Sequence, residues 1–224
     1  PLHGAAEFNA LILSGCTSVH PYNLDGNLIF ATPSHKKHKL QNPPIKMRFS
    51  QLDIKGLWLI EPKRFGDERG YFAETFRRAE FEEATGANGD FIQDNESVSR
   101  YGVVRGLHFQ RGEFWQAKIV RVSRGAVLDV AVDLRAGSPT FGRYAAVELT
   151  ADNGLQLYIP RGFAHGFAVL SPEAQFQYKV DNVYMPSAEC TLSFNNPSVG
   201  VDWRIPIADM TLSPKDMRGL SLDE

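Results

Sequence analysis

The sequence predicts a mostly β protein, an antiparallel sandwich or barrel with a few short helices. Short apolar or alternating segments recur from Gly56 onwards, at the spacing of roughly 8–12 residues that is typical of all-β domains. Turn residues separate these segments, and only one stretch before the C-terminus has a helical pattern. Together these observations favour a β-sandwich or barrel over an α/β fold.

The expected strands cover residues 56–62, 71–76, 91–99, 103–110, 117–135, 144–160, 162–171 and 174–186. The two longest of these runs are interrupted by Arg124-Gly125 and by Asn153-Gly154. Glycine and asparagine adopt positive φ readily, so we expect hairpin turns at both places.

A helix is expected over residues 77–86. Thr75 is the candidate cap at its start, Phe81 and Ala84 share one face, and Gly86 ends it.

The bulk composition excludes several classes of protein. A net charge of −2 argues against a general nucleic-acid binder, and no apolar run reaches the ~20 residues that span a bilayer. Cys16 and Cys190 are the two cysteines in 224 residues, too few for a disulfide framework or a structural zinc site. We therefore expect a cytoplasmic protein.

Residues 1–46 differ from the rest of the chain, with weak periodicity, scattered prolines and a basic SHKKHK stretch. Met47 reads as a natural chain start, so we expect 1–46 to be an N-terminal extension or an artificial leader. A genuine arm that packs on a partner subunit is the alternative. Residues 47–224 are expected to form one domain.

The segment VVRGLHFQ (103–110) places two basic side chains, Arg105 and His108, inside a strand. Regular alternation puts them on opposite faces. A histidine in a strand is more often structural than catalytic, although it is the side chain most easily tuned to act near neutral pH.

Further polar residues lie in other strand-like segments, and with these two they form the set Arg105, His108, Lys118, His165, Tyr178, Lys179 and Tyr184. Turned into a barrel interior, such side chains would suit an anionic small molecule and acid–base chemistry. The histidines show no metal-binding spacing, and no serine-hydrolase elbow, GxGxxG or P-loop motif is present.

Seven motifs then occur in one order: EPKRFGDERGYF (61–72), FIQDN (91–95), RGLHFQ (105–110), VLDVAVDLRAGSPTFG (127–142), LYIPRGFAHGF (157–167), YKVDNVYMP (178–186) and LSPKD (212–216). In this respect the chain resembles the dTDP-4-dehydrorhamnose 3,5-epimerases, nucleotide-sugar epimerases of the cupin superfamily, from about residue 56 to 218. The resemblance implies a jelly-roll barrel and a homodimer, with no metal and no organic cofactor. It also implies a dTDP-linked 4-keto-6-deoxyhexose as substrate.

The family's reaction exchanges protons at the carbons beside the C4 ketone, through an enolate. The resemblance assigns the base to His108, the acid to Tyr178 and support of the enolate oxygen to Lys118. It pairs the base with Asp216, the carboxylate that would fix the histidine tautomer.

The resemblance also places a set of substrate contacts, namely Arg69, Glu74, Gln93, Asn95, Arg105, His165, Tyr184, Glu189 and Lys215. One departure stands out: Phe194-Asn195-Asn196 occupies a place where the family often has Trp-Asn-Asp. The alternatives are a nucleotide-sugar-binding protein of the same fold without useful catalysis and, third, a metal-dependent cupin dioxygenase.

Arg105 and His108 pose a geometric question, because strict alternation keeps them on opposite faces while the resemblance assigns both to one site. A bulge or bend at Gly106 would bring them together, and so would an arginine that serves the neighbouring subunit.

Overall fold

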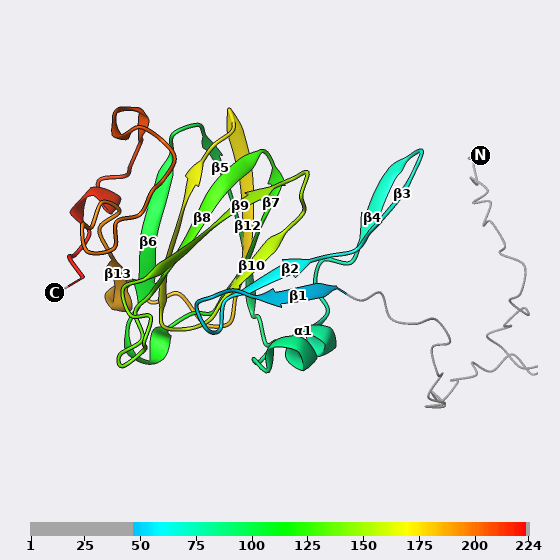
Figure 1. Cartoon of the computed structure of the whole chain (residues 1–224), viewed down its shortest axis with the longest axis horizontal. Helices are drawn as coiled ribbons and strands as arrows, with labels where there is room; N and C mark the ends of the chain where they lie inside the picture. The colour runs from blue at the N-terminus through cyan, green and yellow to red at the C-terminus, as the bar shows by residue number, and fades with distance from the viewer. Residues whose placement is uncertain (1–46, 223–224) are drawn as a thin grey trace, which may run out of the picture. The chain divides into compact units, whose positions relative to one another are not determined.

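The computed structural model describes residues 47–222, which fold mainly into two antiparallel sheets that face each other (Figure 1). The six-stranded sheet has the order β1 (Arg48–Gln51), β2 (Trp58–Glu61), β10 (Gln156–Ile159), β7 (Lys118–Arg124), β12 (Glu173–Val180) and β5 (Gln93–Arg100). The five-stranded sheet has the order β13 (Glu189–Thr191), β6 (Val104–Gln110), β11 (Phe163–Val169), β8 (Ala126–Asp133) and β9 (Tyr144–Thr150). The mostly β sandwich predicted from the sequence is confirmed.

The main core lies between the two sheets. Phe167 of β11 stacks on Phe176 of β12 with ring centroids 4.1 Å apart, and so joins one sheet to the other. Fully buried valines and leucines of both sheets surround this pair. Because these residues alternate along their strands, they define which side chains point into the sandwich.

The outer face of the five-stranded sheet is covered by the chain after β13, where Trp203 and Ile205 pack on Val104 and Leu128. This C-terminal cover includes the short 3₁₀ turns η3 (Ile207–Asp209) and η4 (Asp216–Arg218). Parallel bridges between Val103 and Thr211 and between Leu192 and Leu220 hold it in place.

The departure at Phe194-Asn195-Asn196 lies in this cover. The Phe194 carbonyl accepts the indole N–H of Trp203 at 2.8 Å, and Asn196 Oδ1 accepts the backbone N–H groups of Ser198 and Val199. An aspartate would accept the same two hydrogen bonds, so the change to asparagine preserves the turn.

Both predicted turns exist, but the expectation that they close hairpins is wrong. Gly125 and Gly154 have positive φ, as the turns require. The first turn leads from β7 to β8 and the second from β9 to β10, and in each case the two strands belong to different sheets. In a jelly roll the chain crosses between sheets, so local turn chemistry does not determine which strands pair.

The predicted helix is α1 (Arg78–Thr85), which ends at Gly86 in the left-handed conformation as expected. Thr75 does not cap it: the N-cap is Arg77, which has no side-chain capping hydrogen bond. Phe81 is the buried residue of the helix and packs edge-on against Tyr158 of the six-stranded sheet, at 4.8 Å.

A separate hairpin, β3 (Arg64–Asp67) and β4 (Gly70–Ala73), extends away from the two sheets (Figure 1). Arg64 holds its base by donating to the carbonyls of Ala151 and Asp152, at 2.5 and 2.6 Å. Three aromatic side chains of the hairpin are exposed, namely Phe65, Tyr71 and Phe72.

The predictions about residues 1–46 lie outside the described residues. Over residues 47–222, no helix is both long and apolar enough to cross a membrane.

Candidate active site

His108 of β6 is in contact with Asp216 of the C-terminal cover, although the two residues are distant in sequence. His108 Nε2 lies 2.5 Å from Asp216 Oδ1, and Asp216 is only 4% exposed. Because an ionised carboxylate can only accept, Nε2 carries the proton and Nδ1 keeps its lone pair in the neutral ring. The pair therefore has the geometry of a general base with an orienting carboxylate.

Asp216 remains a carboxylate in spite of its burial. Burial by itself raises the pKa, but hydrogen bonds from His108, Ser213 and the Gly106 backbone outweigh it and hold the pKa of Asp216 below its usual value. The Ser213 hydroxyl donates to Asp216 Oδ2 at 2.8 Å.

The question posed by VVRGLHFQ has a direct answer, because β6 contains a bulge. Across the pairing of β6 with β11, His108 is opposite His165 and Arg105 is opposite Phe167, so three steps on one strand match two on the other. Gly106 sits inside the bulge with φ of 119°. The bulge returns both side chains to one face, as the expected bend at Gly106 required.

Arg105 and His108 line one cavity of about 410 Å³, together with Ser213, Lys215 and Asp216 of the C-terminal cover. Arg105 also donates to the Ser99 hydroxyl at 3.0 Å. Its guanidinium partly offsets the rise that burial causes in the pKa of the Tyr178 phenol.

Beside this pair lies a second, fully buried histidine–carboxylate pair. His165 Nε2 is 2.9 Å from Asp129 Oδ2, and Asp129 Oδ1 is buried without a hydrogen bond in the described part of the chain. Burial lowers the pKa of His165 despite the charge of Asp129. His165 is therefore a neutral ring that donates to Asp129.

Lys118 extends from the opposite sheet into the same region. It pairs with Val180 in the β7–β12 register. It is two residues before the core residue Val120 on β7, so both side chains lie on the inner face of the sheet. Burial lowers the pKa of Lys118 to about 8, while the negative charges of Asp129 and Glu189 act in the other direction. The result is an ammonium group with a pKa of about 8.

Tyr178 is also on the inner face of the six-stranded sheet, where it packs against the main core. Burial raises the pKa of its phenol, so the proton stays on the oxygen at neutral pH. Asn95 and Gln93 of β5 pair with Tyr178 and Val180 of β12, respectively. Because paired residues share a face of the sheet, both lie on the same face as Tyr178.

Three of the residues expected to contact the substrate form one cluster, namely Tyr184, Glu189 and Lys215. Tyr184 donates to Glu189 Oε2 at 2.9 Å, and Lys215 forms an ion pair with Glu189 Oε1. Burial raises the pKa of Glu189, but its bonds with Lys215 and Tyr184 prevail and lower it. Tyr184 itself is exposed.

Within one chain, Arg69 and Glu74 lie away from the contact between His108 and Asp216. Arg69 lies at the exposed tip of the β3–β4 hairpin, where it pairs with Asp67. Glu74 follows β4 and pairs with Arg77, its Oε1 2.6 Å from the arginine Nε.

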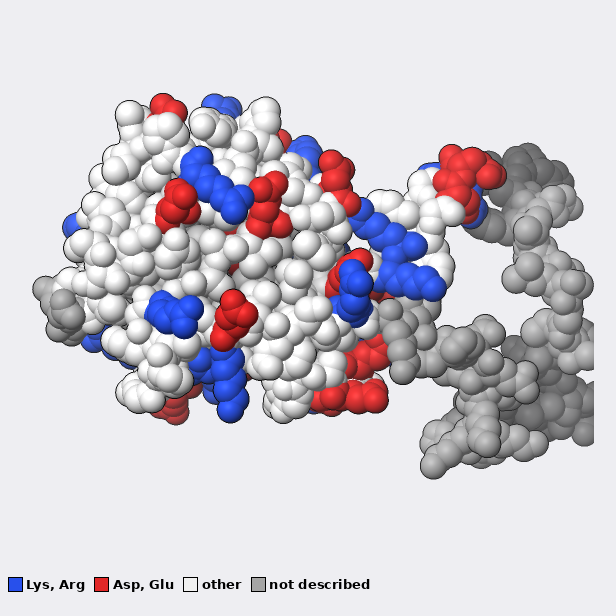
Figure 2. Space-filling model, in the orientation of Figure 1, with Lys and Arg blue, Asp and Glu red and all other residues white. Residues whose placement is uncertain are grey.

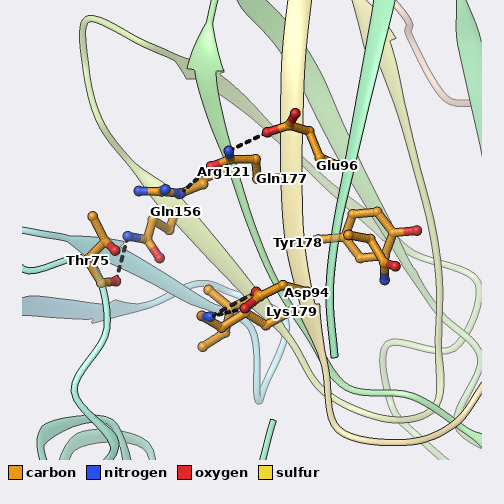
Figure 3. A pocket seen from close by; sticks show the side chains of 10 residues that line it. Thr75, Asp94, Glu96, Arg121, Gln156, Gln177, Tyr178 and Lys179 are labelled. Carbon is orange, nitrogen blue, oxygen red and sulfur yellow. Dashed lines mark hydrogen bonds and ion pairs between the residues drawn. The ribbon is translucent and has the colours of Figure 1, made fainter. Parts of the chain in front are cut away.

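Another cavity, of about 330 Å³, lies on the outer face of the six-stranded sheet (Figure 3). Arg121, Gln177 and Glu96 form a hydrogen-bonded row across it, while Tyr178 points to the other side of β12 (Figure 3). Lys179, expected as one of the inward polar residues, is on this outer face and pairs with Asp94 at 2.8 Å.

The described residues offer no cluster of metal-ligating side chains. Within residues 47–222 no group of three or more His, Cys, Asp or Glu side chains could hold a metal ion. On the face shown in Figure 2, basic and acidic side chains are interspersed.

Sequence reasoning missed two residues of the region, Asp129 and Ser213. An acidic residue inside the apolar run AVLDVAV was a usable indication of Asp129, since a carboxylate on a buried strand needs a partner. Ser213 offered a weaker one, as the first residue of the S-x-x-D spacing that ends at Asp216.

Comparison with known proteins identifies the family of this chain. The sequence profile of the dTDP-4-dehydrorhamnose 3,5-epimerases matches residues 51–224. The dTDP-4-dehydrorhamnose 3,5-epimerase of Escherichia coli K12 is 48% identical over 178 residues, which are 80% of this chain and 96% of the relative.

Two solved structures are similar in fold. The epimerase of Elizabethkingia anophelis NUHP1 has 51% identity and a TM-score of 0.77, over 79% of this chain and 97% of its own. The enzyme of Legionella pneumophila Philadelphia 1, solved in complex with dTDP-4-keto-L-rhamnose, has 45% identity and a TM-score of 0.76, over 79% and 93%. Fold, histidine–aspartate geometry and similarity over most of the chain lead to one conclusion: this chain belongs to the dTDP-4-dehydrorhamnose 3,5-epimerase family.

Proposed function

We propose that the protein is a cofactor-independent epimerase of a dTDP-linked 4-keto-6-deoxyhexose, acting at C3, C5 or both in rhamnose-type deoxysugar biosynthesis. The observation that carries the proposal is the contact of 2.5 Å between His108 and the buried Asp216. It supplies a base whose ring is oriented by a carboxylate.

The reaction begins at a C–H bond beside the C4 ketone, which is acidic because the resulting carbanion is an enolate. Nδ1 of His108 takes this proton, and the Asp216 carboxylate stabilises the imidazolium that forms. The ammonium of Lys118 stabilises the negative charge that develops on the ketone oxygen.

Inversion requires the proton to return from the opposite side of the sugar ring. His108 comes from the five-stranded sheet and Tyr178 from the six-stranded sheet. A sugar bound between the sheets would therefore have the base on one face and a protonated phenol on the other.

The test is incubation with a dTDP-4-keto-6-deoxyhexose in deuterated water, followed by position-resolved NMR. We expect deuterium at C3, C5 or both, with inversion at the labelled carbon. Absence of exchange by the native protein, with His108→Asn as the inactive reference, would overturn the proposal.

The non-catalytic alternative gains no support from the departure at Phe194-Asn195-Asn196. Asn196 keeps the hydrogen bonds of a turn in the C-terminal cover, and the contact between His108 and Asp216 is intact. Tight dTDP binding without exchange at either carbon would favour that alternative.

We further propose that the active species is a homodimer in which the β3–β4 hairpin reaches the partner subunit. An isolated two-stranded hairpin is marginally stable in water, and Tyr71 and Phe72 are 62% and 64% exposed. A second subunit would bury these rings and receive Arg69 beside its own nucleotide.

Mixing two inactive variants tests this exchange. Arg69→Ala disables only the hairpin, and His108→Asn disables only the base. In a mixed dimer the subunit with an intact His108 would receive an intact Arg69 from the other subunit, which completes one site. We expect measurable activity after mixing, and a dimeric mass by light scattering that Tyr71→Ser/Phe72→Ser reduces. No regain of activity would contradict the exchanged hairpin.

We also propose that the protein acts in the cytoplasm, where nucleotide sugars are the expected substrates. Two cysteines without a disulfide framework suit a reducing compartment. Fractionation of cells that express the tagged chain checks this, and recovery in an oxidising compartment would contradict it.

A further inference from the structure

Asp216 stands on a short turn whose first residue is Ser213. The Asp216 backbone N–H donates to Ser213 Oγ at 3.2 Å, and the same hydroxyl donates to Asp216 Oδ2 at 2.8 Å. In a capping box the acidic side chain returns to the backbone N–H of the cap residue. Here it does not: Asp216 Oδ1 is directed to His108.

The carboxylate is therefore held at both oxygens. Ser213 occupies Oδ2, His108 meets Oδ1, and the Gly106 N–H adds a further hydrogen bond. A carboxylate with one partner can rotate about its Cβ–Cγ bond, whereas partners on both oxygens fix its plane. The Ser213 hydroxyl is the side chain that does this from the C-terminal cover.

We propose that Ser213 is a positioning residue, whose hydroxyl keeps the Asp216 carboxylate turned toward His108 so that Nδ1 of the ring faces the substrate. The inference rests on the proposed epimerase function. It adds a residue outside the catalytic set, one that touches no reacting atom.

Backbone hydrogen bonds that do not involve this hydroxyl also hold the turn and its flanks. The Met217 N–H donates to the Ser213 carbonyl and the Arg218 N–H to the Lys215 carbonyl, each at 3.1 Å. On either side, the Thr211 carbonyl accepts the Val104 N–H at 3.0 Å and the Thr191 carbonyl accepts the Leu220 N–H at 2.8 Å. Removal of Oγ should leave these backbone bonds in place.

Three variants of the full chain make the test. Ser213→Ala removes the hydroxyl, and Ser213→Thr retains it. Ser193→Ala removes a hydroxyl from the same cover, one that donates to Asn195 at 2.7 Å. For each variant kcat, KM, the pH profile of kcat/KM, dTDP affinity and Tm are measured.

We expect Ser213→Ala to reduce kcat by about 10–100-fold, the usual effect of losing an orienting partner. KM, dTDP affinity and Tm should stay close to those of the native protein. The acidic limb of kcat/KM should move to higher pH, because Asp216 loses a donor that holds its pKa down. Ser213→Thr should restore most of the rate, and Ser193→Ala should behave like the native protein.

Two results would overturn the proposal. One is an unchanged kcat and pH profile in Ser213→Ala. The other is a loss of activity in Ser213→Ala that follows an equal loss of Tm or dTDP affinity, since the hydroxyl would then be structural. Failure of the proposed function looks different, because the native protein itself would show no exchange in deuterated water.

Discussion

His165 donates its Nε2 proton to Asp129 at 2.9 Å, and both side chains are buried on the inner face of the five-stranded sheet. His165 lies directly opposite His108 in the pairing of β11 with β6. Burial lowers the pKa of His165, so this ring is neutral at pH 7. The negative charge of Asp129 acts on Lys118, where it raises the pKa of the ammonium and so favours its protonated form.

This relationship predicts the effect of Asp129→Asn. The amide oxygen can still accept the His165 proton, but the negative charge that raises the pKa of Lys118 is lost. We expect the alkaline limb of the kcat profile to move to lower pH. The value of kcat should fall by about tenfold, and the fall should be greater at pH 8 than at pH 6.5. A uniform loss across this range would contradict the electrostatic link.

Lys118 itself should show a trade-off between activity and stability. Its pKa of about 8 means that the ammonium is present below that pH and lost above it, so native activity should fall as pH rises through 8. Lys118→Met removes a charge from a half-buried position whose surroundings disfavour the ammonium. We expect kcat to fall by about 10²–10³-fold while the free energy of unfolding at pH 7 rises by about 1–2 kcal/mol.

Chemical denaturation at pH 7 and at pH 10 checks the stability half of this prediction. The native protein should gain stability over this interval relative to Lys118→Met, because the unfolded lysine binds more protons than the folded one. An equal difference at both pH values would argue against a buried ammonium.

Gly106→Ala should disrupt the β6 bulge. A methyl group there would lie 2.6 Å from Gly166 Cα and 2.7 Å from the His165 carbonyl, at φ of 119°. We expect a loss of about 2–4 kcal/mol in the free energy of unfolding, from strain and overpacking together. Gly137→Ala is the control, since it has φ of 75° but no atom within 4 Å, and should cost about 1 kcal/mol. Similar losses in both variants would mean that the close approach is unimportant.

Tyr178→Phe should separate proton exchange from inversion. His108 can still remove the proton and return a deuteron from the same side, but no phenol supplies one from the other side. We expect deuterium in recovered substrate while the yield of inverted product falls at least about 10²-fold. Undiminished inversion would remove Tyr178 from the role of acid.

The sequence predicted the strands well where alternation and turn residues agree, as in β7, β8 and β12. It could not predict that Gly125 and Gly154 link strands of different sheets, because pairing depends on the whole sandwich and not on the turn. The contact of Asp216 with His108 was expected from the motif order, since no local pattern connects residues so far apart. The bulge at Gly106 was inferred only because two motif residues otherwise conflicted.

Other features could not be predicted from the sequence, for physical reasons. The place of Arg69 on an extended hairpin depends on how β3 and β4 leave the sandwich. The roles of Asp129 and Ser213 depend on contacts between strands or segments that come together only in the folded chain.

The most direct test of the central claim compares the native protein with Asp216→Asn in the deuterium exchange assay. An amide cannot stabilise the imidazolium, and it can favour the wrong tautomer of His108, so exchange should slow by about 10³–10⁴-fold while dTDP still binds. Exchange at the native rate by a folded Asp216→Asn would contradict the account of His108 as a base oriented by Asp216.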